Sequence, residues 1–247
     1  MNPVILCPPV STGALPWAAK TLSGQGCTVT EAPGNGVTHV LLPVPSFSGG
    51  IAKFHPDILE QVPKNAVLIG GRFPENMGHP VWDLLENNDY LWKNAAITAH
   101  CALTLAAAHL PTVWEGLPVL ILGWGRIGKQ LAQKLSILGA RVTVAARREE
   151  ARAEAAAFSL DTLDFPAVYK QISQFRLIYN TVPAPVISAE VLGLCRGDCL
   201  KIELASAPGM AGPGILDGRG LPGKMAPERA GALMAETILS LLKEGKA

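Results

Sequence analysis

The sequence predicts an α/β protein with two domains, each built on a parallel sheet. Short apolar runs suited to strands alternate with segments of helical periodicity along most of the chain. The length of 247 residues exceeds that of one typical domain, and a hydrophobic content of 49% is sufficient for two buried cores. A glycine-rich turn between a strand and a helix, near the middle of the chain, further indicates that the larger domain has a doubly wound sheet.

Residues 116–148 have the order strand, glycine turn, helix and second strand. The apolar run 119–122 is short enough for a strand buried on both faces, and Gly123, Gly125 and Gly128 follow at the GxGxxG spacing. The first glycine permits the tight turn, the second lets the backbone approach a pyrophosphate, and the third lets the helix pack on the strand. We therefore predict a Rossmann domain that binds a dinucleotide, and a glycine-rich turn without a ligand is the alternative. The residues of the turn and of the helix N-terminus are Gly123, Trp124, Gly125, Arg126, Ile127 and Gly128.

The end of the second strand indicates which dinucleotide is bound. NAD enzymes usually place Asp or Glu about 20 residues beyond the first glycines, to accept hydrogen bonds from the ribose 2′-hydroxyl. This chain has Arg147 and Arg148 there instead. Two guanidinium groups can hold a 2′-phosphate by paired, charge-assisted hydrogen bonds, so the sequence favours NADP. The alternative is that both arginines only begin a solvated helix.

The remaining elements divide the chain into domains. Residues 1–93 are expected to form a smaller flavodoxin-like or Rossmann-like substrate domain, and residues 94–226 the dinucleotide-binding domain. A last helix within 227–247 is expected to pack back against the first domain. Strands are expected at 4–7, 28–31, 37–44, 66–70, 177–180 and 200–204, and helices at 15–23, 55–62, 81–87, 94–109, 151–158, 189–194 and 227–242.

Ligands of doubly wound sheets lie beyond the carboxyl ends of the strands. The segment that follows the expected strand 177–180 and the segment 205–209 should therefore flank the nicotinamide. Asn180 and Thr181 offer short polar groups, and the alternative is that NTVP is only a turn. Ser206 follows the same reasoning on the next strand. The candidates after the first of these strands are Asn180, Thr181, Val182 and Pro183.

Composition narrows the class of ligand. A net charge of +1, without long runs of like charge, gives no electrostatic case for nucleic acid. The weakly polar stretch 95–110 is too short to span a bilayer, and the start of the chain lacks the basic region of a signal peptide. Five cysteines without a paired CxxC fit reduced thiols, and Cys195 and Cys199 alone make a poor metal site. We expect a cytoplasmic protein that binds small molecules and no metal.

Several segments together resemble the bacterial dipicolinate synthase A family. They are WKNAAITAHCALTLAAAH, VLILGWGRIGKQLAQKLSILGARVTVAARR, IYNTVPAPVIS, IELASAPG and GLPGKMAPERAGALMAETIL, in that order. The resemblance implies oxidation of a dihydrodipicolinate-type intermediate to pyridine-2,6-dicarboxylate with NADP, during sporulation. It also implies an architecture similar to that of the D-2-hydroxyacid dehydrogenases and a flavoprotein-like partner, dipicolinate synthase B. A homo-oligomer is expected as well.

The chain departs from the family pattern at three places. It has CPPVSTG where members usually have a Gly-Gly-Asp-x-Arg-Gln turn, His100 in a region where an acidic residue is usual, and Glu203 where Asp is usual. The first 90 residues therefore carry less of the resemblance than the rest.

A dicarboxylate substrate needs cations, and a dehydrogenase needs a base. Lys224 in GLPGK is the preferred cation because Pro and Gly on both sides would hold its backbone, and Arg72 in GGRFP is the second candidate. His100 lies on the long helix and could take a proton, although a lone histidine among Ala and Leu is at least as often a core residue. Closure about hinges near 92–94 and in GLPGKMAP would carry Lys224 and His100 toward the nicotinamide.

The sequence leaves three functions open. The first is an NADP-dependent oxidoreductase of the dipicolinate synthase type. The second is a related 2-hydroxyacid dehydrogenase with another substrate, although residues 110–247 contain no histidine of the kind that family uses. The third is a nucleotide-binding subunit that is not catalytic without a partner.

Overall fold

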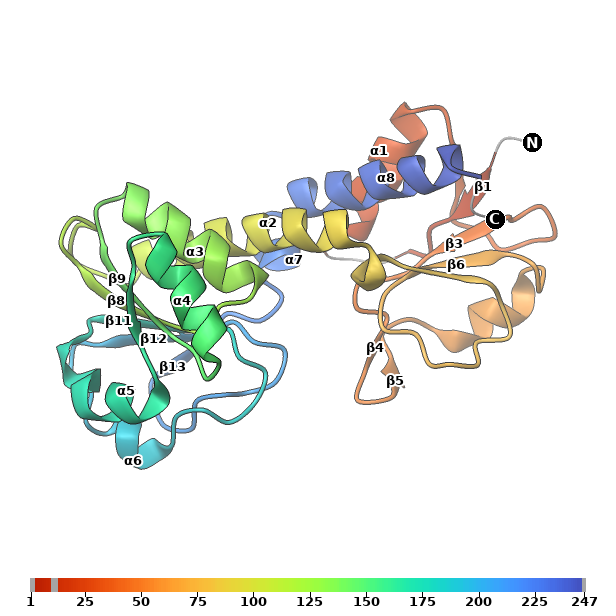
Figure 1. Cartoon of the computed structure of the whole chain (residues 1–247). Coiled ribbons are helices and arrows are strands. Elements are labelled where there is room, and N and C mark those ends of the chain that lie inside the picture. The colour runs from red at the N-terminus through yellow and green to blue at the C-terminus, as the bar shows by residue number, and fades with distance from the viewer. Residues whose placement is uncertain (1–2, 10–12, 246–247) are drawn as a thin grey trace. The chain divides into compact units, whose positions relative to one another are not determined.

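A computed structural model describes residues 3–9 and 13–245. The chain divides into two compact units, of which unit 1 comprises Met1–Ile97 and Pro222–Ala247 and unit 2 comprises Thr98–Leu221. The division falls within helix α2 (Asn88–Ala107), so one helix belongs partly to each unit (Figure 1). The last two residues of the expected C-terminal segment and positions 10–12 of the CPPVSTG turn lie outside the described residues.

Unit 1 contains a parallel five-stranded sheet in the order β2-β1-β3-β6-β7. If the strands of this sheet are counted by themselves, the order is that of flavodoxin-like folds. The strands are β1 (Val4–Leu6), β2 (Thr28–Thr30), β3 (His39–Leu41), β6 (Val67–Gly70) and β7 (Val81–Asp83), beside a hairpin of β4 (Phe47–Ser48) and β5 (Ile51–Ala52). The helical segments that precede α2 in this unit are α1 (Leu15–Gly24) and the 3₁₀ turns η1 (Pro56–Gln61) and η2 (Leu84–Glu86).

One expected helix of unit 1 is wrong. Residues 81–87 form strand β7 followed by η2 instead of a helix. Val81 and Trp82 are residue types that favour strands, and β7 pairs in parallel with residues 68–70 of β6. Asp83 then caps η2, because its carboxylate accepts a hydrogen bond from the backbone N–H of Leu85 at 2.8 Å.

Helix α8 (Pro227–Lys243) packs against α1 within unit 1 (Figure 1). The two backbones approach closely at Gly231, where a Cβ atom would lie 2.4 Å from the carbonyl oxygen of Ala14 and 2.6 Å from Cβ of Trp17. Apolar side chains of both helices are buried; they include Leu15, Ala18, Leu22, Leu233, Met234 and Ile238. The chain therefore returns to unit 1 at its end.

The segment before α8 also differs from expectation. The segment GLPGKMAP (220–227), expected to be a hinge in which Pro and Gly hold the backbone of Lys224, contains the short helix α7 (Leu221–Met225). Buried Leu221 anchors this turn, and Pro222 is tolerated because the first N–H groups of a helix have no partner within it.

Unit 2 contains a parallel six-stranded sheet in the order β10-β9-β8-β11-β12-β13. Counted within the unit, this is the 3-2-1-4-5-6 order of the Rossmann fold, so the predicted fold class is confirmed. The strands are β8 (Pro118–Leu122), β9 (Arg141–Ala145), β10 (Asp161–Leu163), β11 (Leu177–Asn180), β12 (Leu200–Glu203) and β13 (Ile215–Asp217). The helices are α3 (Arg126–Ile137), α4 (Glu149–Ala157), α5 (Phe165–Gln171) with η3 (Ile172–Gln174), and α6 (Ala189–Leu192).

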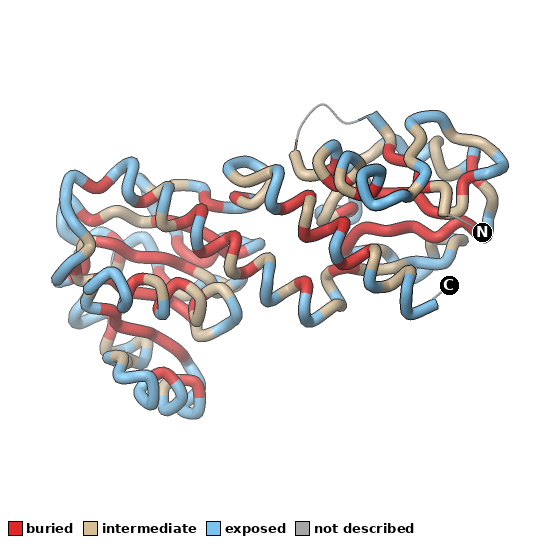
Figure 2. Tube along the Cα trace, turned by 90° about the horizontal axis from the view of Figure 1, so that it is seen from above, coloured by how far each residue is buried: buried red, intermediate tan, exposed pale blue. Residues whose placement is uncertain are grey.

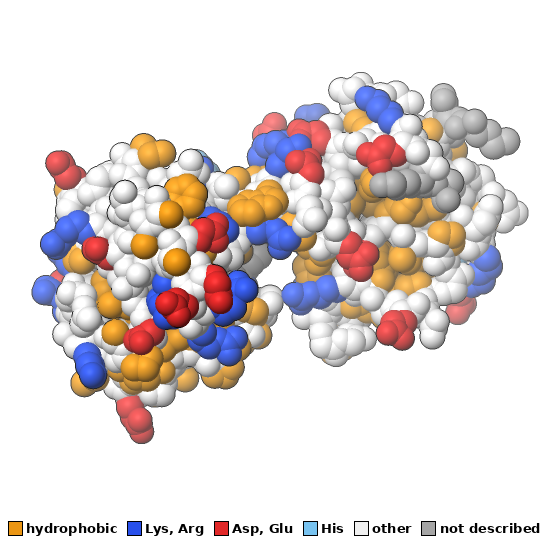
Figure 3. Space-filling view, in the orientation of Figure 1, with side chains coloured by type: hydrophobic (Ala, Val, Ile, Leu, Met, Phe, Trp, Pro, Cys, Tyr) orange, Lys and Arg blue, Asp and Glu red, His pale blue; other side chains and the backbone are white. Residues whose placement is uncertain are grey.

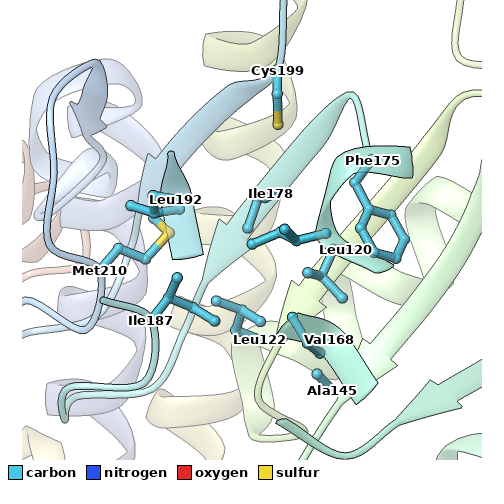
Figure 4. Packing of buried hydrophobic residues seen from close by; sticks show 11 residues of the cluster. Leu120, Leu122, Ala145, Val168, Phe175, Ile178, Ile187, Leu192, Cys199 and Met210 are labelled. Carbon is cyan, nitrogen blue, oxygen red and sulfur yellow. The ribbon is translucent and has the colours of Figure 1, made fainter. Parts of the chain in front are cut away.

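The core of unit 2 holds the strand ends in place. Leu120, Leu122 and Ile178 from the central strands pack against Val168 and Phe175 from α5 and the end of η3 (Figure 4). The fully buried strands appear as continuous buried segments in Figure 2. Because Leu122 immediately precedes Gly123, this packing fixes where the glycine turn begins.

The face of the molecule shown in Figure 3 carries charges of both signs, and basic and acidic side chains are interspersed on it. Within the described part of the chain, no helix is both long enough and apolar enough to cross a membrane.

Candidate functional site

The three glycines of the turn after β8 have different surroundings. Gly123 has a φ of +102°, and a Cβ atom there would lie 2.5 Å from Oγ1 of Thr181. A Cβ atom at Gly128 would lie 2.3 Å from the carbonyl oxygen of Gly123. Packing within the protein therefore requires both glycines. Gly125 differs, because a Cβ atom there would have no neighbour within 4 Å.

Gly125 also occupies the N-cap position of α3, with an extended backbone at φ −87° and ψ −171°. The first N–H groups of an α-helix have no partner within the helix and carry its positive dipole end. The open side of Gly125 and the N-terminus of α3 thus form a place where a phosphate group can approach the backbone.

A pocket of about 480 Å³ lies over this turn. It is formed by residues at or just beyond the carboxyl ends of β8, β9 and β11, with additional contributions from α4 and α5. Its lining residues are Gly123, Trp124, Gly125, Ala146, Arg147, Arg148, Ala151, Phe165, Thr181, Val182 and Pro183. Most of the predicted cofactor residues therefore meet in one pocket of unit 2. Arg126 and Ile127 lie in the first turn of α3 beside it, and Asn180 is not part of its wall.

The basic end of the pocket follows β9. Arg147 and Arg148 are exposed, and Arg148 occupies the N-cap position of α4. Arg152, which the sequence did not single out, donates from one guanidinium nitrogen to the carbonyl oxygens of Ala146 and Arg147, both at 2.8 Å. Arg152 therefore holds the backbone that carries Arg147. Arg147 and Arg152 also line an adjoining pocket of about 450 Å³.

The part of the pocket wall at Trp124 is held by contacts that involve α3 and α4. Lys129 of α3 forms an ion pair with Glu154 of α4, and its Nζ lies 5.7 Å from the centre of the Trp124 ring. The hydrogen bond from Lys129 lowers the pKa of Glu154. The Trp124 ring in turn lies 6.3 Å from that of Phe158, between ring centres. Trp124 is thus packed among side chains of both helices where it lines the pocket.

Asn180 is fully buried, and its amide is engaged inside the protein. The amide nitrogen donates to Oε1 of Glu203 at 2.7 Å and to the carbonyl oxygen of Val182 at 3.0 Å. The amide oxygen accepts from the backbone N–H of Val182 at 3.0 Å. The sequence predicted that this amide contacts a cofactor. In the structure both its nitrogen and its oxygen instead make hydrogen bonds within the protein. Thr181 is also tied down, because its hydroxyl donates to the carbonyl oxygen of Leu122 at 2.8 Å.

The candidates for chemistry lie in both units. His100 on α2 and Ser206 after β12 are exposed residues of unit 2, so the alternative of a buried core histidine is wrong. Lys224 on α7 and Arg72 after β6 are exposed residues of unit 1. Arg72 has a φ of +59°, and its backbone N–H donates to the carboxylate of Asp83 at 2.7 Å.

The fold and the pocket define the class of protein. Two parallel-sheet units, of which one has Rossmann order and a glycine turn beneath a pocket, form an NAD(P)-binding oxidoreductase-like fold. No protein-family model matches the chain. Among the residues that the structure describes, no cluster of three or more His, Cys, Asp or Glu side chains could hold a metal ion.

Comparison with known proteins gives a narrower result. The chain is 27% identical to dipicolinate synthase A of Bacillus subtilis (strain 168), a protein named as one subunit of its enzyme, over 88% of this chain and 82% of that protein. The crystal structure of dipicolinate synthase A from Bacillus halodurans is 25% identical, with a TM-score of 0.82 over 98% of this chain and 97% of that chain. A transhydrogenase from Sinorhizobium meliloti shares the fold, with a TM-score of 0.78 at 15% identity over 98% and 94% of the two chains. The resemblance to dipicolinate synthase A is therefore confirmed.

Proposed function

We propose that this protein is an NADP-dependent oxidoreductase of the dipicolinate synthase type, which oxidises a small cyclic dicarboxylate. The observation that carries the proposal is the position of Arg147 and Arg148 in one pocket with the glycine turn. The residues that directly follow β9 are Ala146, Arg147 and Arg148, so no carboxylate stands at the end of this strand.

The pocket residues occur in the order that a bound dinucleotide requires. The 2′-phosphate would bind between the two guanidinium groups, because each can donate paired, charge-assisted hydrogen bonds. The pyrophosphate would cross the open side of Gly125, at the N-terminus of α3. The nicotinamide would lie toward 181–183, beyond the carboxyl end of β11.

Three residues with exposed polar side chains are proposed to act on the substrate: His100, Ser206 and Lys224. Bound NADP⁺ supplies the acceptor for a hydride from a ring carbon of the substrate. We propose that His100 takes the proton that the substrate loses, that Lys224 binds a substrate carboxylate, and that Ser206 contacts the substrate or the nicotinamide. The similarity to a dipicolinate synthase protein supports the small dicarboxylate as substrate class.

Calorimetry with NADPH and NADH tests the cofactor. We expect NADPH to bind at least about tenfold more tightly, which corresponds to about 1.4 kcal/mol. The double variant R147A/R148A should lose this preference with little effect on NADH, because the lost contacts belong only to the 2′-phosphate. A matched double variant, R196A/R229A, removes two exposed, ion-paired arginines outside the pocket lining and should keep the preference. Equal affinities in the unaltered protein would refute the NADP assignment.

A second candidate is a nucleotide-binding protein that needs a partner for activity. The observation that favours it is that the similar Bacillus subtilis protein is, by its name, one part of a larger enzyme. The chain should be assayed for NADP-linked oxidation of dihydrodipicolinate-type substrates, both alone and with a flavoprotein-like partner. Substantial turnover by the chain alone would rule out this candidate.

A further inference from the structure

Glu203, at the end of β12, is a carboxylate almost removed from solvent, with 5% of its surface exposed. Oε1 accepts from the amide of Asn180 at 2.7 Å and from the backbone N–H of Ala205 at 3.0 Å. Oε2 accepts from the backbone N–H groups of Gly209 at 2.9 Å and Met210 at 3.3 Å. Four N–H donors from two segments of the chain therefore converge on one side chain.

No ion pair found among residues 3–9 and 13–245 involves Glu203. Its burial is instead compensated by hydrogen bonds, three of which come from the single loop 205–210. This loop bends around the carboxylate, and it can do so only because residue 209 is glycine. A Cβ atom at Gly209 would lie 2.3 Å from Nδ2 of Asn180 and 2.7 Å from the carbonyl oxygen of Val182.

The same network extends to the wall of the pocket. Asn180 joins Glu203 to Val182, since its side chain makes hydrogen bonds to both the N–H and the carbonyl oxygen of Val182. Val182 lines the pocket, and its neighbour Thr181 is held against β8. The backbone of the pocket wall at 181–183 is therefore positioned from behind by a buried carboxylate on the next strand.

We propose that Glu203 is a positioning residue, which acts through Asn180 to set the pocket wall against which the nicotinamide half of the dinucleotide lies. We call the arrangement of Glu203, Asn180 and the loop 205–210 the clamp. Its existence does not depend on the proposed function, whereas the placement of the nicotinamide against this wall rests on that function. Glu203 holds the wall and does not touch the reacting atoms. A carboxylate is required because both oxygens must accept, whereas a glutamine would direct an NH₂ group at N–H donors.

The variant E203Q tests the clamp by comparing two ligands, NADPH and adenosine 2′,5′-bisphosphate, which lacks the pyrophosphate and the nicotinamide half. We expect E203Q to weaken NADPH binding about tenfold and to leave binding of the bisphosphate within about twofold. The matched control is Y179F, which removes one buried hydrogen bond from the same strand, that from the Tyr179 hydroxyl to the carbonyl oxygen of Ala102 at 3.0 Å. Y179F should leave both affinities within about twofold. An equal loss for both ligands in E203Q, or no loss for either, would overturn the proposal.

Hydrogen exchange separates failure of the clamp from failure of the cofactor assignment. Amides of 181–187 and 205–211 should exchange faster in E203Q than in Y179F, with or without a nucleotide. If neither nucleotide binds the unaltered protein, the proposed function fails, and exchange still decides whether the clamp exists. If E203Q does not fold, N180S replaces it, because N180S removes the bridge to Val182 and leaves Glu203 its three backbone donors. N180S should give the same selective loss of NADPH affinity, and unchanged exchange in these segments would contradict the clamp.

Discussion

Replacing Gly125 by alanine adds one methyl group where the protein leaves room for it. The residue has an extended backbone that alanine adopts without strain, and no protein atom lies within 4 Å of the new Cβ. We expect the free energy of unfolding of G125A to stay within about 0.5 kcal/mol of the unaltered protein. The methyl group would nevertheless occupy the space assigned to the pyrophosphate, so NADPH affinity should fall by at least about tenfold, or about 1.4 kcal/mol.

Gly128 should respond in the opposite way. A methyl group there would lie 2.3 Å from the carbonyl oxygen of Gly123, so α3 must move away from the end of β8. Such overpacking costs about 1–3 kcal/mol. Unit 2 lies between the domain sizes for which 1 kcal/mol shifts the melting temperature by about 4–8 °C and about 2–4 °C, so at about 4 °C for each kcal/mol its melting temperature in G128A should fall by roughly 4–12 °C.

These predictions are tested by measuring the melting temperature of G125A and G128A by scanning calorimetry and their affinity for NADPH by titration. G197A is the matched control. Gly197 is an exposed residue of unit 2, an added Cβ atom there would have no neighbour within 4 Å, and the residue is not part of the pocket lining. G197A should change neither stability nor affinity. If G125A binds NADPH as tightly as G197A, the pyrophosphate does not cross Gly125, and the reasoning that assigns this pocket to the dinucleotide is refuted.

Three further predictions concern other contacts. R152A removes the two hydrogen bonds that hold the backbone at Arg147. NADPH affinity measured by calorimetry should therefore fall about three- to tenfold, while NADH affinity stays unchanged. An equal fall in both affinities would contradict this role of Arg152. G231A should lower the unfolding free energy of unit 1 by about 1–3 kcal/mol, because the new Cβ would meet Ala14 of α1, whereas G223A, with open space, should not. Burial raises the pKa of Cys7 to about 11 and that of Cys199 to about 12, from 9.0. The unfolded chain therefore loses these protons first as the pH rises. The contribution of these two thiols to stability in urea should be constant below pH 9 and should fall between pH 9 and 11, so stability in this range should fall less steeply in C7A/C199A; equal slopes would contradict the prediction.

The fold of unit 2 could be predicted because its signals are local. The strand 119–122, the glycine turn and the helix that follows each have a pattern within a few residues, and the structure contains all three as β8, the turn and α3. Strands β10 and β13 were not predicted. Each has only three residues and lies at an edge of the sheet, so its stability comes from pairing with β9 or β12, which the local pattern does not reveal.

The site shows the same limit. Arg147 and Arg148 were predicted because position after a strand suffices to identify them. Arg152 was missed because its partners are backbone carbonyl oxygens, which every sequence offers everywhere. For Glu203 a signal did exist. A carboxylate at the end of the strand segment LKIEL (200–204) must find several donors when that end of the strand is buried, and its role as the centre of a clamp follows from that requirement.

The return of α8 to unit 1 sets an order for the growing chain. Unit 2 is one continuous stretch, Thr98–Leu221, and can complete its sheet as soon as that stretch has left the ribosome. Unit 1 cannot, because the helix that covers α1 follows unit 2 in the sequence. Until Pro227–Lys243 is synthesised, the apolar face of α1 that carries Leu15 and Leu22 lacks its partner helix. Synthesis that stops between unit 2 and α8 would therefore release a complete unit 2 attached to an incomplete unit 1.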